Sequence, residues 1–561
     1  MPAGPTPAPP PANDPAGRLA GGPAPELVAT AYLREVRDQV GLYRGMSQAD
    51  LAHVVMLLEA GLVPREAGGA LLAALLAMHP DPPLDFVLDP AQGDLYSNRE
   101  AYLRMLTPAA GWLSVGRARR EATTVGWRLA VRERLLALAG ALAQCAQAVL
   151  IRAEAERATL FPDYTYLQPA QPTTFGHYLL TFAYPLLRDL DRLRAAYPRA
   201  NASPAGSGSV NGSRLPLDRG RLADLLGCDT VITHTRDAMW QADGPIELAA
   251  LISAALVNLD RLAEDLQLFA TAEFGLVALA DRHSRTSVIM PQKKNPYALA
   301  YLRGLCGEAI GTLAAMAAVG KTPSGQIDSR LFVYGTIPRA LDSTAGAARL
   351  MTDVVRGLQV DAGRSTRRAA EDFLGATDLA EVVMLHAGLD YKTAHGLVAR
   401  AVREALETGA TTLSAGRLDA AALAMLGRPL GLTPEAVAEA LDPARIVAAR
   451  SGLGGAALPA VMQMIAECRE ALADHARWRA QAEARLAAAE TGLLMAVAAH
   501  KLAGARPAEE ATPSEPGADS PGAHLPAGAP PELRQPPSLD DIADFVFKDL
   551  PRPPNRRRWS Q

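Results

Sequence analysis

Long stretches with apolar residues at helical spacing dominate the chain. The pattern is clearest over about 126–158, where Ala and Leu form one stripe and Arg and Glu lie opposite. Four similar stretches follow, at about 173–197, 244–272, 297–319 and 334–358. The loops between them contain most of the Gly and Pro. Five helices of this length predict a helical bundle.

Shorter helical stretches flank this bundle. Upstream the periodicity is helical, with breaks near 43–46 and 61–64. Ser47, followed three residues later by Asp50, resembles a helix N-cap. After the fifth long helix, helical spacing resumes. The pattern therefore predicts three ordered parts, namely an N-terminal helical domain at 26–112, the long-helix bundle at 113–364 and a C-terminal helical domain at 365–497.

Both ends of the chain have compositions that disfavour a packed core. Residues 1–25 are rich in Pro, Ala and Gly and lack the basic start and apolar run of a secretory signal, so we expect a disordered leader. Residues 504–561 are similarly biased, which predicts a disordered Pro-rich tail. Within this tail, 539–550 has apolar residues at helical spacing among aspartates. This short amphipathic segment either docks on a protein partner or on the chain's own domains, or is a chance pattern.

Composition agrees with a helical, soluble protein. Hydrophobic residues make up 49% and charged residues 21%, while aromatics reach only 5%, a balance that favours helices over sheets and predicts an all-α fold. A net charge of −4 does not indicate a general nucleic-acid binder. No segment has the unbroken apolarity expected of a membrane span. We therefore predict a cytoplasmic protein.

The four cysteines lie far apart, without the spacing of metal ligands. Each sits in an apolar, helix-like context, which predicts buried free thiols in a reducing compartment. Nothing in the chain predicts a metal site or a bound cofactor.

The most informative polar segment is 286–296, with the sequence Thr-Ser-Val-Ile-Met-Pro-Gln-Lys-Lys-Asn-Pro. Its two prolines disfavour helix and predict an ordered bend, and a helix should begin at about Pro296. A loop that leads into a helix N-terminus offers free N–H groups for an anion beside Lys293. Composition alone leaves a second interpretation equally open, a basic surface loop capped by prolines.

The segment resembles the signature loop of the fumarase/aspartase superfamily. Seven consecutive residues, 290–296, are identical to the form found in argininosuccinate lyases. Residues 116–121, Gly-Arg-Ala-Arg-Arg-Glu, match the family's Gly-Arg-Ser-Arg-Asn-Asp. Residues 164–172, Tyr-Thr-Tyr-Leu-Gln-Pro-Ala-Gln-Pro, match Tyr-Thr-His-Leu-Gln-x-Ala-Gln-Pro. The likeness extends over roughly 26–495.

The resemblance implies a fold and an assembly. The fold is all-α of the fumarase/aspartase type, with a central bundle of five long helices between two smaller helical domains. The assembly is a homotetramer, in which the three matching regions come from different subunits and meet in one site. The activity is that of a lyase of amino-acid metabolism, which cleaves a C–N bond by β-elimination and releases fumarate from an N-succinyl, argininosuccinate-like dicarboxylate substrate.

The resemblance also assigns roles to residues. Ser287 is the base, and the dianionic intermediate that it generates needs fixed positive charge and hydrogen-bond donors. The expected catalytic residues are Ser287, Tyr166 and Lys293, and the expected substrate-binding residues are Arg117, Arg119, Arg120, Thr165, Gln168 and Asn295. Two plainer interpretations remain open. One is that Ser287 is an ordinary loop serine. The other is that the three arginines belong to a solvated helix start and pair with Glu121.

Several positions depart from the family pattern. Tyr166 replaces a histidine and Ala300 replaces the glutamate that pairs with it, so both halves of this pair are missing together. Tyr166 could still donate a proton to a leaving group. The usual pKa of tyrosine, near 10, suits a different leaving group from the one that a histidine serves. Arg120 replaces an asparagine of the family. Residues 321–328 do not reproduce the family segment that binds the arginine part of argininosuccinate. These departures predict a changed substrate.

Two alternatives to this lyase remain. The first is a divergent superfamily enzyme of secondary metabolism that runs another elimination, an addition or a cyclisation. The second is a non-catalytic tetrameric scaffold that presents its C-terminal tails to partners.

Overall fold

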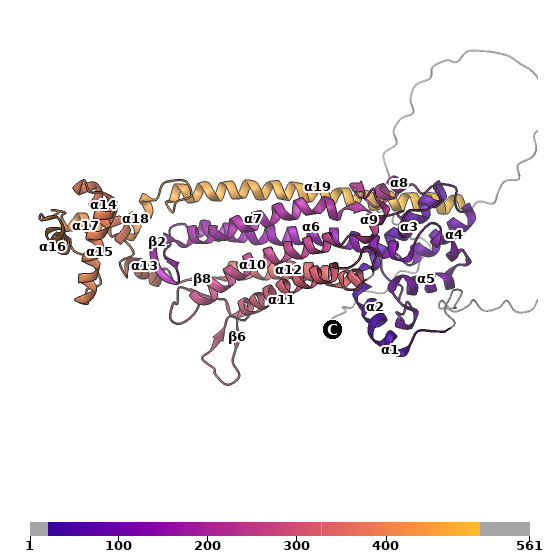
Figure 1. The fold of residues 1–561 in the computed structure, drawn as a ribbon, viewed down its shortest axis with the longest axis horizontal. Helices are drawn as coiled ribbons and strands as arrows, with labels where there is room; N and C mark the ends of the chain where they lie inside the picture. The colour runs from indigo at the N-terminus through magenta and orange to yellow at the C-terminus, as the bar shows by residue number, and fades with distance from the viewer. Residues whose placement is uncertain (1–20, 327, 505–561) are drawn as a thin grey trace, which may run out of the picture.

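A bundle of five long helices forms the middle of an elongated molecule (Figure 1). The computed structural model describes residues 21–326 and 328–504. The bundle helices are α6 (Arg119–Ala155), α7 (Phe175–Ala200), α10 (Asp243–Phe269), α11 (Tyr297–Gly320) and α12 (Asp328–Gly357). The predicted all-α fold with five long central helices is confirmed.

Helix α6 is the core of the bundle. It packs along both α7 and α12, and residues such as Leu138, Leu142 and Val149 are almost fully buried in the largest apolar cluster. At its N-terminal end α6 is crossed by α3 (Tyr43–Glu59), where a Cβ added to Gly45 would lie 2.5 Å from the carbonyl oxygen of Gly126. Only two glycines allow the backbones to approach this closely. The N-terminal helices are therefore held tightly against α6.

Helix α6 begins seven residues before the predicted start near Gly126. The first turns carry Arg119, Arg120 and Glu121, which precede the range predicted from the apolar periodicity. The charges do not break the helix because each finds a partner in the surrounding structure, as described below. Tertiary contacts here outweigh the local pattern.

The N-terminal helices are α1 (Pro25–Leu27), a π-helix (Val28–Tyr32), α2 (Leu33–Gln39), α3, α4 (Arg65–Ala77) and α5 (Leu95–Leu106). Of these, α3, α4 and α5 contribute residues to the second apolar cluster. The first break lies at Val40–Leu42, slightly earlier than predicted. The N-cap predicted at Ser47 is wrong, because Ser47 lies buried inside α3 and shares a hydrogen bond of 3.0 Å with His79 Nδ1.

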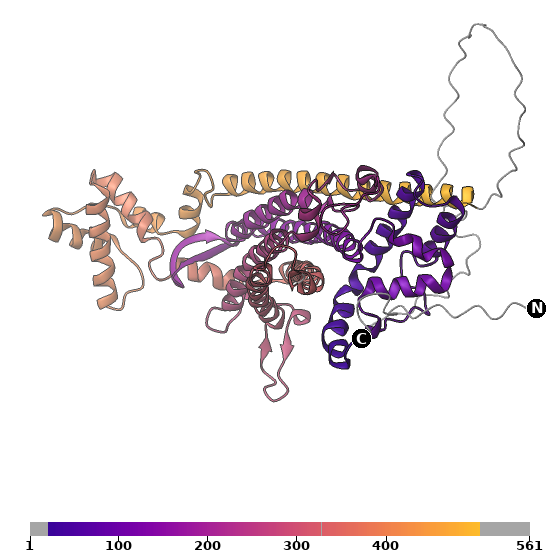
Figure 2. The ribbon, with the colours of Figure 1, turned by 45° about the vertical axis from the view of Figure 1, so that its right-hand side comes forward.

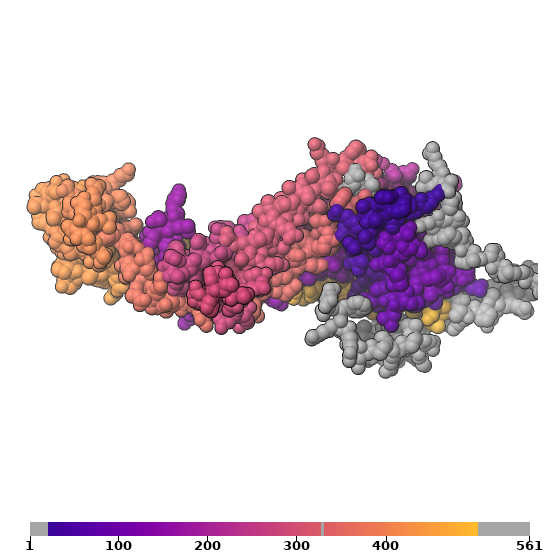
Figure 3. Space-filling model, turned by 90° about the horizontal axis from the view of Figure 1, so that it is seen from below, coloured from indigo at the N-terminus to yellow at the C-terminus, as the bar shows by residue number. Residues whose placement is uncertain are grey.

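The helices beyond the bundle divide into two groups. Helices α13 (Ala362–Ala370), α14 (Ala376–Ala387), α15 (Tyr391–Glu407), α16 (Ala415–Leu426), α17 (Pro434–Ala440) and α18 (Pro443–Ala449) lie at one end of the molecule. A third apolar cluster, from Leu379 to Val437, holds α14–α17 together. Figure 3 shows these orange helices at the opposite end from the indigo N-terminal helices.

Helix α19 (Leu458–Gly504) is placed differently from what its range suggested. It falls within the C-terminal domain predicted at 365–497, but it runs back along α6 and α7 and reaches α4 (Figures 1 and 2). Its first half, including Val461 and Ile465, joins the bundle cluster, and Leu493 and Val497 join the N-terminal cluster. The domain boundaries themselves remain a prediction.

The strands are short and form four separate two-stranded pairs. They are β1 (Leu160–Thr165) with β2 (Gln168–Thr174), β3 (Ala202–Ser203) with β4 (Thr230–Val231), β5 (Val277–Ala278) with β8 (Gln359–Val360), and β6 (Arg285–Thr286) with β7 (Lys294–Asn295). Only β3 and β4 pair in parallel. The β1–β2 and β6–β7 hairpins matter most, because they carry two of the three regions singled out in the sequence.

Two helices bear on the prediction that no segment has the unbroken apolarity of a membrane span. By length and composition alone, α6 and α11 are both long and apolar enough. In α6 that apolar stretch is 67% buried inside the protein, as expected of a core helix, but in α11 it is only 28% buried. Tyr297, Tyr301 and Ile310 of α11 are each about half exposed. The apolar surface of α11 therefore lacks a covering partner within the described chain.

The cysteine prediction holds for three positions. Cys145, Cys306 and Cys468 are buried free thiols, whereas Cys228 is only partly buried. The amphipathic segment at 539–550 and most of the predicted leader lie outside the described residues, and the cytoplasmic location remains a prediction.

If α19 stabilises the bundle, then Ile465→Ala should lower the free energy of unfolding by about 2–5 kcal/mol, because Ile465 is fully buried. Leu458→Ala on the same helix is the control. Leu458 is half exposed, so its loss should be within about 0.5 kcal/mol. Chemical denaturation of both variants measures the difference, and equal losses would contradict the packing of α19.

Candidate functional site

The β6–β7 hairpin presents the segment 286–296 away from the bundle, as Figure 2 shows. Thr286 pairs with Lys294 and Arg285 pairs with Asn295, so the turn between them forms a projecting loop. The side chains of Val288 and Ile289 at its tip are exposed. Helix α11 follows directly after Pro296, as the sequence predicted. Both apolar side chains therefore face solvent in the single chain.

The polar groups of this hairpin have distinct partners. The backbone N–H of Met290 donates to Ser287 Oγ at 3.2 Å, so the loop turns around this hydroxyl. The Asn295 side chain donates to the carbonyl of Arg285 at 2.9 Å and closes the base of the hairpin. Asn295 therefore has a structural bond already, and its amide is only partly available to a ligand.

The two lysines of the loop differ in environment. Lys294 Nζ donates to the carbonyl of Leu279 at 2.6 Å and pairs with Asp281 Oδ1 at 2.7 Å. The Lys293 ammonium has no hydrogen bond or ion pair with any described residue, and the side chain is exposed. Lys294 thus anchors the hairpin, and Lys293 is the cation left for a ligand.

The β1–β2 hairpin places the second region at its tip. Tyr166 and Leu167 form the turn with φ values of +54° and +58°, between the paired residues Thr165 and Gln168. Positive φ is uncommon for such side chains. Tyr166 is 99% exposed and Thr165 and Gln168 are exposed beside it. These three predicted site residues therefore contact no other predicted site residue within one chain.

The third region lies at the start of α6, where Arg117 is buried. Its Nη1 lies 2.8 Å from Asp50 Oδ1, and the other Asp50 oxygen lies 2.8 Å from Arg99 Nη2. Burial acts to lower the pKa of Arg117, but Asp50 and nearby groups raise it overall. The same buried patch lowers the pKa of His53 to about 3, through burial and the Arg117 charge. Arg117 is thus a structural cation here.

Arg119 and Arg120 lie closer to the surface. Arg120 is paired with Glu35 and lies 3.9 Å from Asp94, whereas the more exposed Arg119 lies 3.6 Å from Asp94. Asp94 also caps α5 by accepting from the N–H of Ser97. Arg119 is therefore the guanidinium of this cluster most accessible to a carboxylate.

Glu121 does not pair with these arginines in the way the solvated-helix interpretation assumed. Its two oxygens accept the backbone N–H groups of Gly206 and Gly208, at 2.7 and 2.6 Å. Burial raises the pKa of Glu121 to about 7, although Arg117 and these two N–H groups oppose the shift. Glu121 thus fixes the Gly/Ser loop against the start of α6.

The three regions lie apart within one chain. Helix α6 has 37 residues and is about 55 Å long, with the arginines at its start and the β1–β2 hairpin just beyond its end. The β6–β7 hairpin projects from a third place (Figure 1). A single described chain does not bring Ser287, Tyr166 and Arg119 together.

Sequence reasoning missed the acids that hold the arginines. Asp50 was taken for part of a helix cap, but an acid beside an apolar run of a helix, here Leu51 to Leu57, is itself a signal of a buried ion pair. Glu35 gave no comparable signal, since it lies between Arg34 and Val36 in a segment without an apolar run. Its role depends on the docking of α2 against α6.

Comparison with protein families gives two matches. A lyase family model matches residues 57–311, and a model of the argininosuccinate lyase C-terminal region matches 373–448. The chain is 33% identical to the argininosuccinate lyase of Methanoculleus marisnigri, over 85% of this chain and 97% of that protein. It is 31% identical to the argininosuccinate lyase of Methanothermobacter thermautotrophicus, over 81% and 97% of the two chains.

Solved structures give the same picture. EDDS lyase in complex with formate is 30% identical and superposes with a TM-score of 0.77, over 86% of this chain and 97% of that one. A variant of that enzyme has been solved with bound fumarate. Class II fumarase from Schistosoma mansoni shares the fold, at 15% identity and a TM-score of 0.62, over 74% and 94% of the two chains.

Replacing Asp50 should strongly destabilise the start of α6. In Asp50→Asn two buried guanidiniums, Arg99 and Arg117, lose their carboxylate, so we expect a loss of about 3–5 kcal/mol in the free energy of unfolding. Glu59→Gln on the same helix removes an exposed pair with Arg221 and should cost about 0–1 kcal/mol. Urea unfolding compares the two, and similar small losses would show that the buried pair is not needed.

Proposed function

Because this chain belongs to the argininosuccinate lyase-like members of the fumarase/aspartase superfamily, we propose that it cleaves a C–N bond by β-elimination and releases fumarate, with Ser287 as the base. The observation that carries the proposal is the β6–β7 hairpin. It presents Ser287 and Lys293 on one loop, in the segment that matches the family signature, and the Lys293 ammonium has no ion pair with a described residue.

The chemistry requires a base and a fixed cation. Removing a proton from the carbon beside a carboxylate puts a second negative charge on that carboxylate, and preorganised charge stabilises it. Lys293 can supply this charge because no described residue neutralises it. A serine needs help to act as a base. The Met290 N–H that points at Ser287 Oγ would also stabilise an alkoxide there.

The site is proposed to form between chains of a homotetramer. The separation of the three regions along α6 supports this arrangement, and so do the exposed apolar side chains at the tips of both hairpins. The half-exposed apolar face of α11 supplies a surface for the helical core of the assembly. Arg119, Thr165 and Gln168 would then contact a dicarboxylate held by the loop of another chain.

The proposed substrate is an N-succinyl compound that differs from argininosuccinate on its amine side. The observation that favours a change is Tyr166, which stands fully exposed at the hairpin tip where the family has a histidine. The dicarboxylate end, by contrast, retains its serine, lysine and asparagine.

The direct experiment measures fumarate released from a panel of N-substituted aspartates. Ser287→Ala should lower the rate with the best substrate by about a hundred- to ten-thousand-fold, because it removes the base. Lys293→Met should lower kcat by a comparable factor through lost charge stabilisation. Absence of fumarate from every member of the panel would contradict the proposal, as would full activity in Ser287→Ala.

The α11 surface gives a prediction on assembly. Ile310→Asp places a charge on the half-exposed apolar face, so the protein should sediment as smaller species than the wild-type tetramer. Leu423→Asp on α16 is a control of similar exposure outside the bundle and should leave the tetramer intact. Sedimentation velocity measures both. An unchanged assembly in Ile310→Asp would exclude α11 from the interface.

A further inference from the structure

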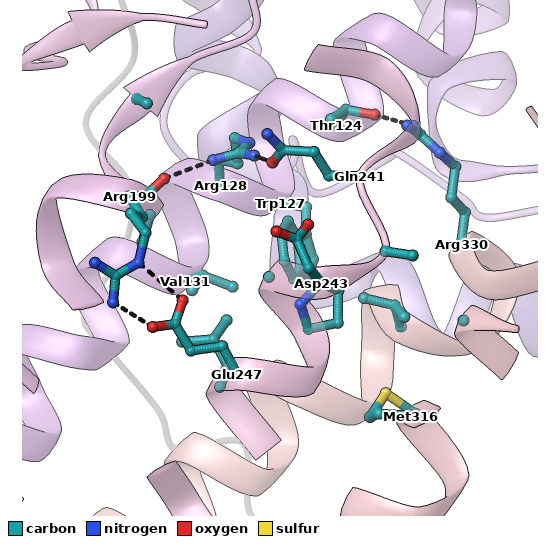
Figure 4. Close-up of a pocket in the computed structure, with 18 of the residues that line it drawn as sticks. Thr124, Trp127, Arg128, Val131, Arg199, Gln241, Asp243, Glu247, Met316 and Arg330 are labelled. Carbon is teal, nitrogen blue, oxygen red and sulfur yellow. Dashed lines mark hydrogen bonds and ion pairs between the residues drawn. The ribbon is translucent and has the colours of Figure 1, made fainter. Parts of the chain in front are cut away.

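A cavity of about 200 Å³ lies inside the bundle, away from both hairpins. It is lined by α6, by the start of α10 and by the facing ends of α7, α11 and α12, and it is open to solvent on one side (Figure 4). Neither Ser287, Lys293 nor Tyr166 lines it. In other proteins a cavity of about 150 Å³ holds a ligand of the size of benzene. The cavity can therefore hold a small organic molecule.

Arg128 of α6 contributes one buried cation to the cavity. Its guanidinium donates to the carbonyl of Arg199 at 2.9 Å and to the side chain of Gln241, which are both neutral acceptors. Its Nε is buried and has no hydrogen-bond partner. Burial lowers the pKa of Arg128 to about 10. Unlike Arg117, this buried guanidinium has no carboxylate in contact.

Arg330 of α12 contributes the second cation. It donates to the hydroxyls of Thr124 and Tyr334 and lies over the ring of Trp240, 4.6 Å from the ring centroid. None of these contacts carries a negative charge, and no described carboxylate forms an ion pair with it. Arg330 is only 7% exposed. Two buried guanidiniums thus line one cavity with no carboxylate of a described side chain in contact, and the carboxylate of a ligand can supply that contact.

The other charged groups of the cavity lie on exposed residues. Glu247 is paired with Arg199 in a two-pronged contact that includes a bond of 2.9 Å, so this pair is neutral overall. Asp243, in the first turn of α10, forms no ion pair with a described residue. The exposed side therefore carries one uncompensated negative charge, which disfavours a second anionic group on the ligand.

The rest of the wall is mostly apolar. Trp127, Val131, Leu248 and Met316 line the space between the buried arginines and the exposed acids. A ligand that fits these walls needs an apolar body of a few carbon atoms, with the negative charge at one end only.

We propose that this cavity is a second ligand site, which binds a small monocarboxylate with an apolar body, its carboxylate held by Arg128 and Arg330. The geometry of two buried guanidiniums that line one cavity, with no carboxylate of a described side chain in contact, carries the proposal. It does not rest on the proposed lyase activity. The site lies one helical turn beyond Arg120, and the Thr124 hydroxyl bonded by Arg330 donates to the carbonyl of Arg120 at 2.7 Å.

The test uses the full-length Ser287→Ala protein and isothermal titration calorimetry, so that turnover plays no part. 4-Methylpentanoate is the probe, and 4-methylpentanamide has the same shape without the charge. The acid should bind about tenfold or more tightly than the amide, because the amide complex lacks the hydrogen bonds between the guanidiniums and a charged carboxylate. Adipate, with a second carboxylate facing Asp243, should bind more weakly than 4-methylpentanoate. Equal binding of acid and amide, or no binding of the acid, would overturn the proposal.

A variant pair locates the binding. Arg330→Gln should weaken 4-methylpentanoate binding by about tenfold or more. Arg236→Gln is the matched control, since Arg236 lies nearby, contacts Ser324 and does not line the cavity. The acid-to-amide ratio of the Ser287→Ala protein serves as a check that does not depend on how well Arg330→Gln folds. Unchanged binding in Arg330→Gln would overturn the assignment.

The source of the carboxylate is decided by inhibition of fumarate release. If the carboxylate belongs to the amine half of the substrate, then 4-methylpentanoate should compete with substrate. If it belongs to an independent metabolite, 4-methylpentanoate should still change the rate of fumarate release when substrate is saturating. L-Leucine adds an ammonium to the same skeleton. Tighter binding of leucine would identify an amino acid as the ligand that also uses Asp243.

Discussion

The length and stiffness of α6 constrain everything else in this protein. One helix of 37 residues separates the arginines at its start from the β1–β2 hairpin beyond its end by about 55 Å. No loop movement of ordinary size closes that gap within a chain. Chemistry that needs both regions must therefore use more than one copy of the chain, and the exposed hairpin tips and α11 face are the surfaces available for it.

The start of α6 is held by buried ion pairs. Asp50 pairs with both Arg99 and Arg117, and Glu35 with Asp94 holds Arg120 and Arg119. These bonds give the cationic cluster a fixed shape, but they also occupy most of it. The N-terminal helices thus determine which guanidinium stays accessible to solvent, and Arg119 is the one least constrained.

The sequence allowed the fold to be predicted because the five long helices have strong periodicity and their ends are marked by Gly and Pro. It did not reveal that α19 runs back along the bundle, since its apolar positions face two different clusters. The Ser287 loop was found because its residues are contiguous. Arg128 and Arg330 were not found, because they are about 200 positions apart and become neighbours only when α6 packs on α12.

The central claim is that one catalytic site uses residues from different chains. Ser287→Ala and Thr165→Val, each expected to be nearly inactive alone, can be co-expressed with two tags and purified as mixed oligomers. If Ser287 and Thr165 of different chains share a site, random mixing should restore fumarate release to about a quarter of the wild-type rate. Mixed oligomers that stay as inactive as the separate variants would contradict the account.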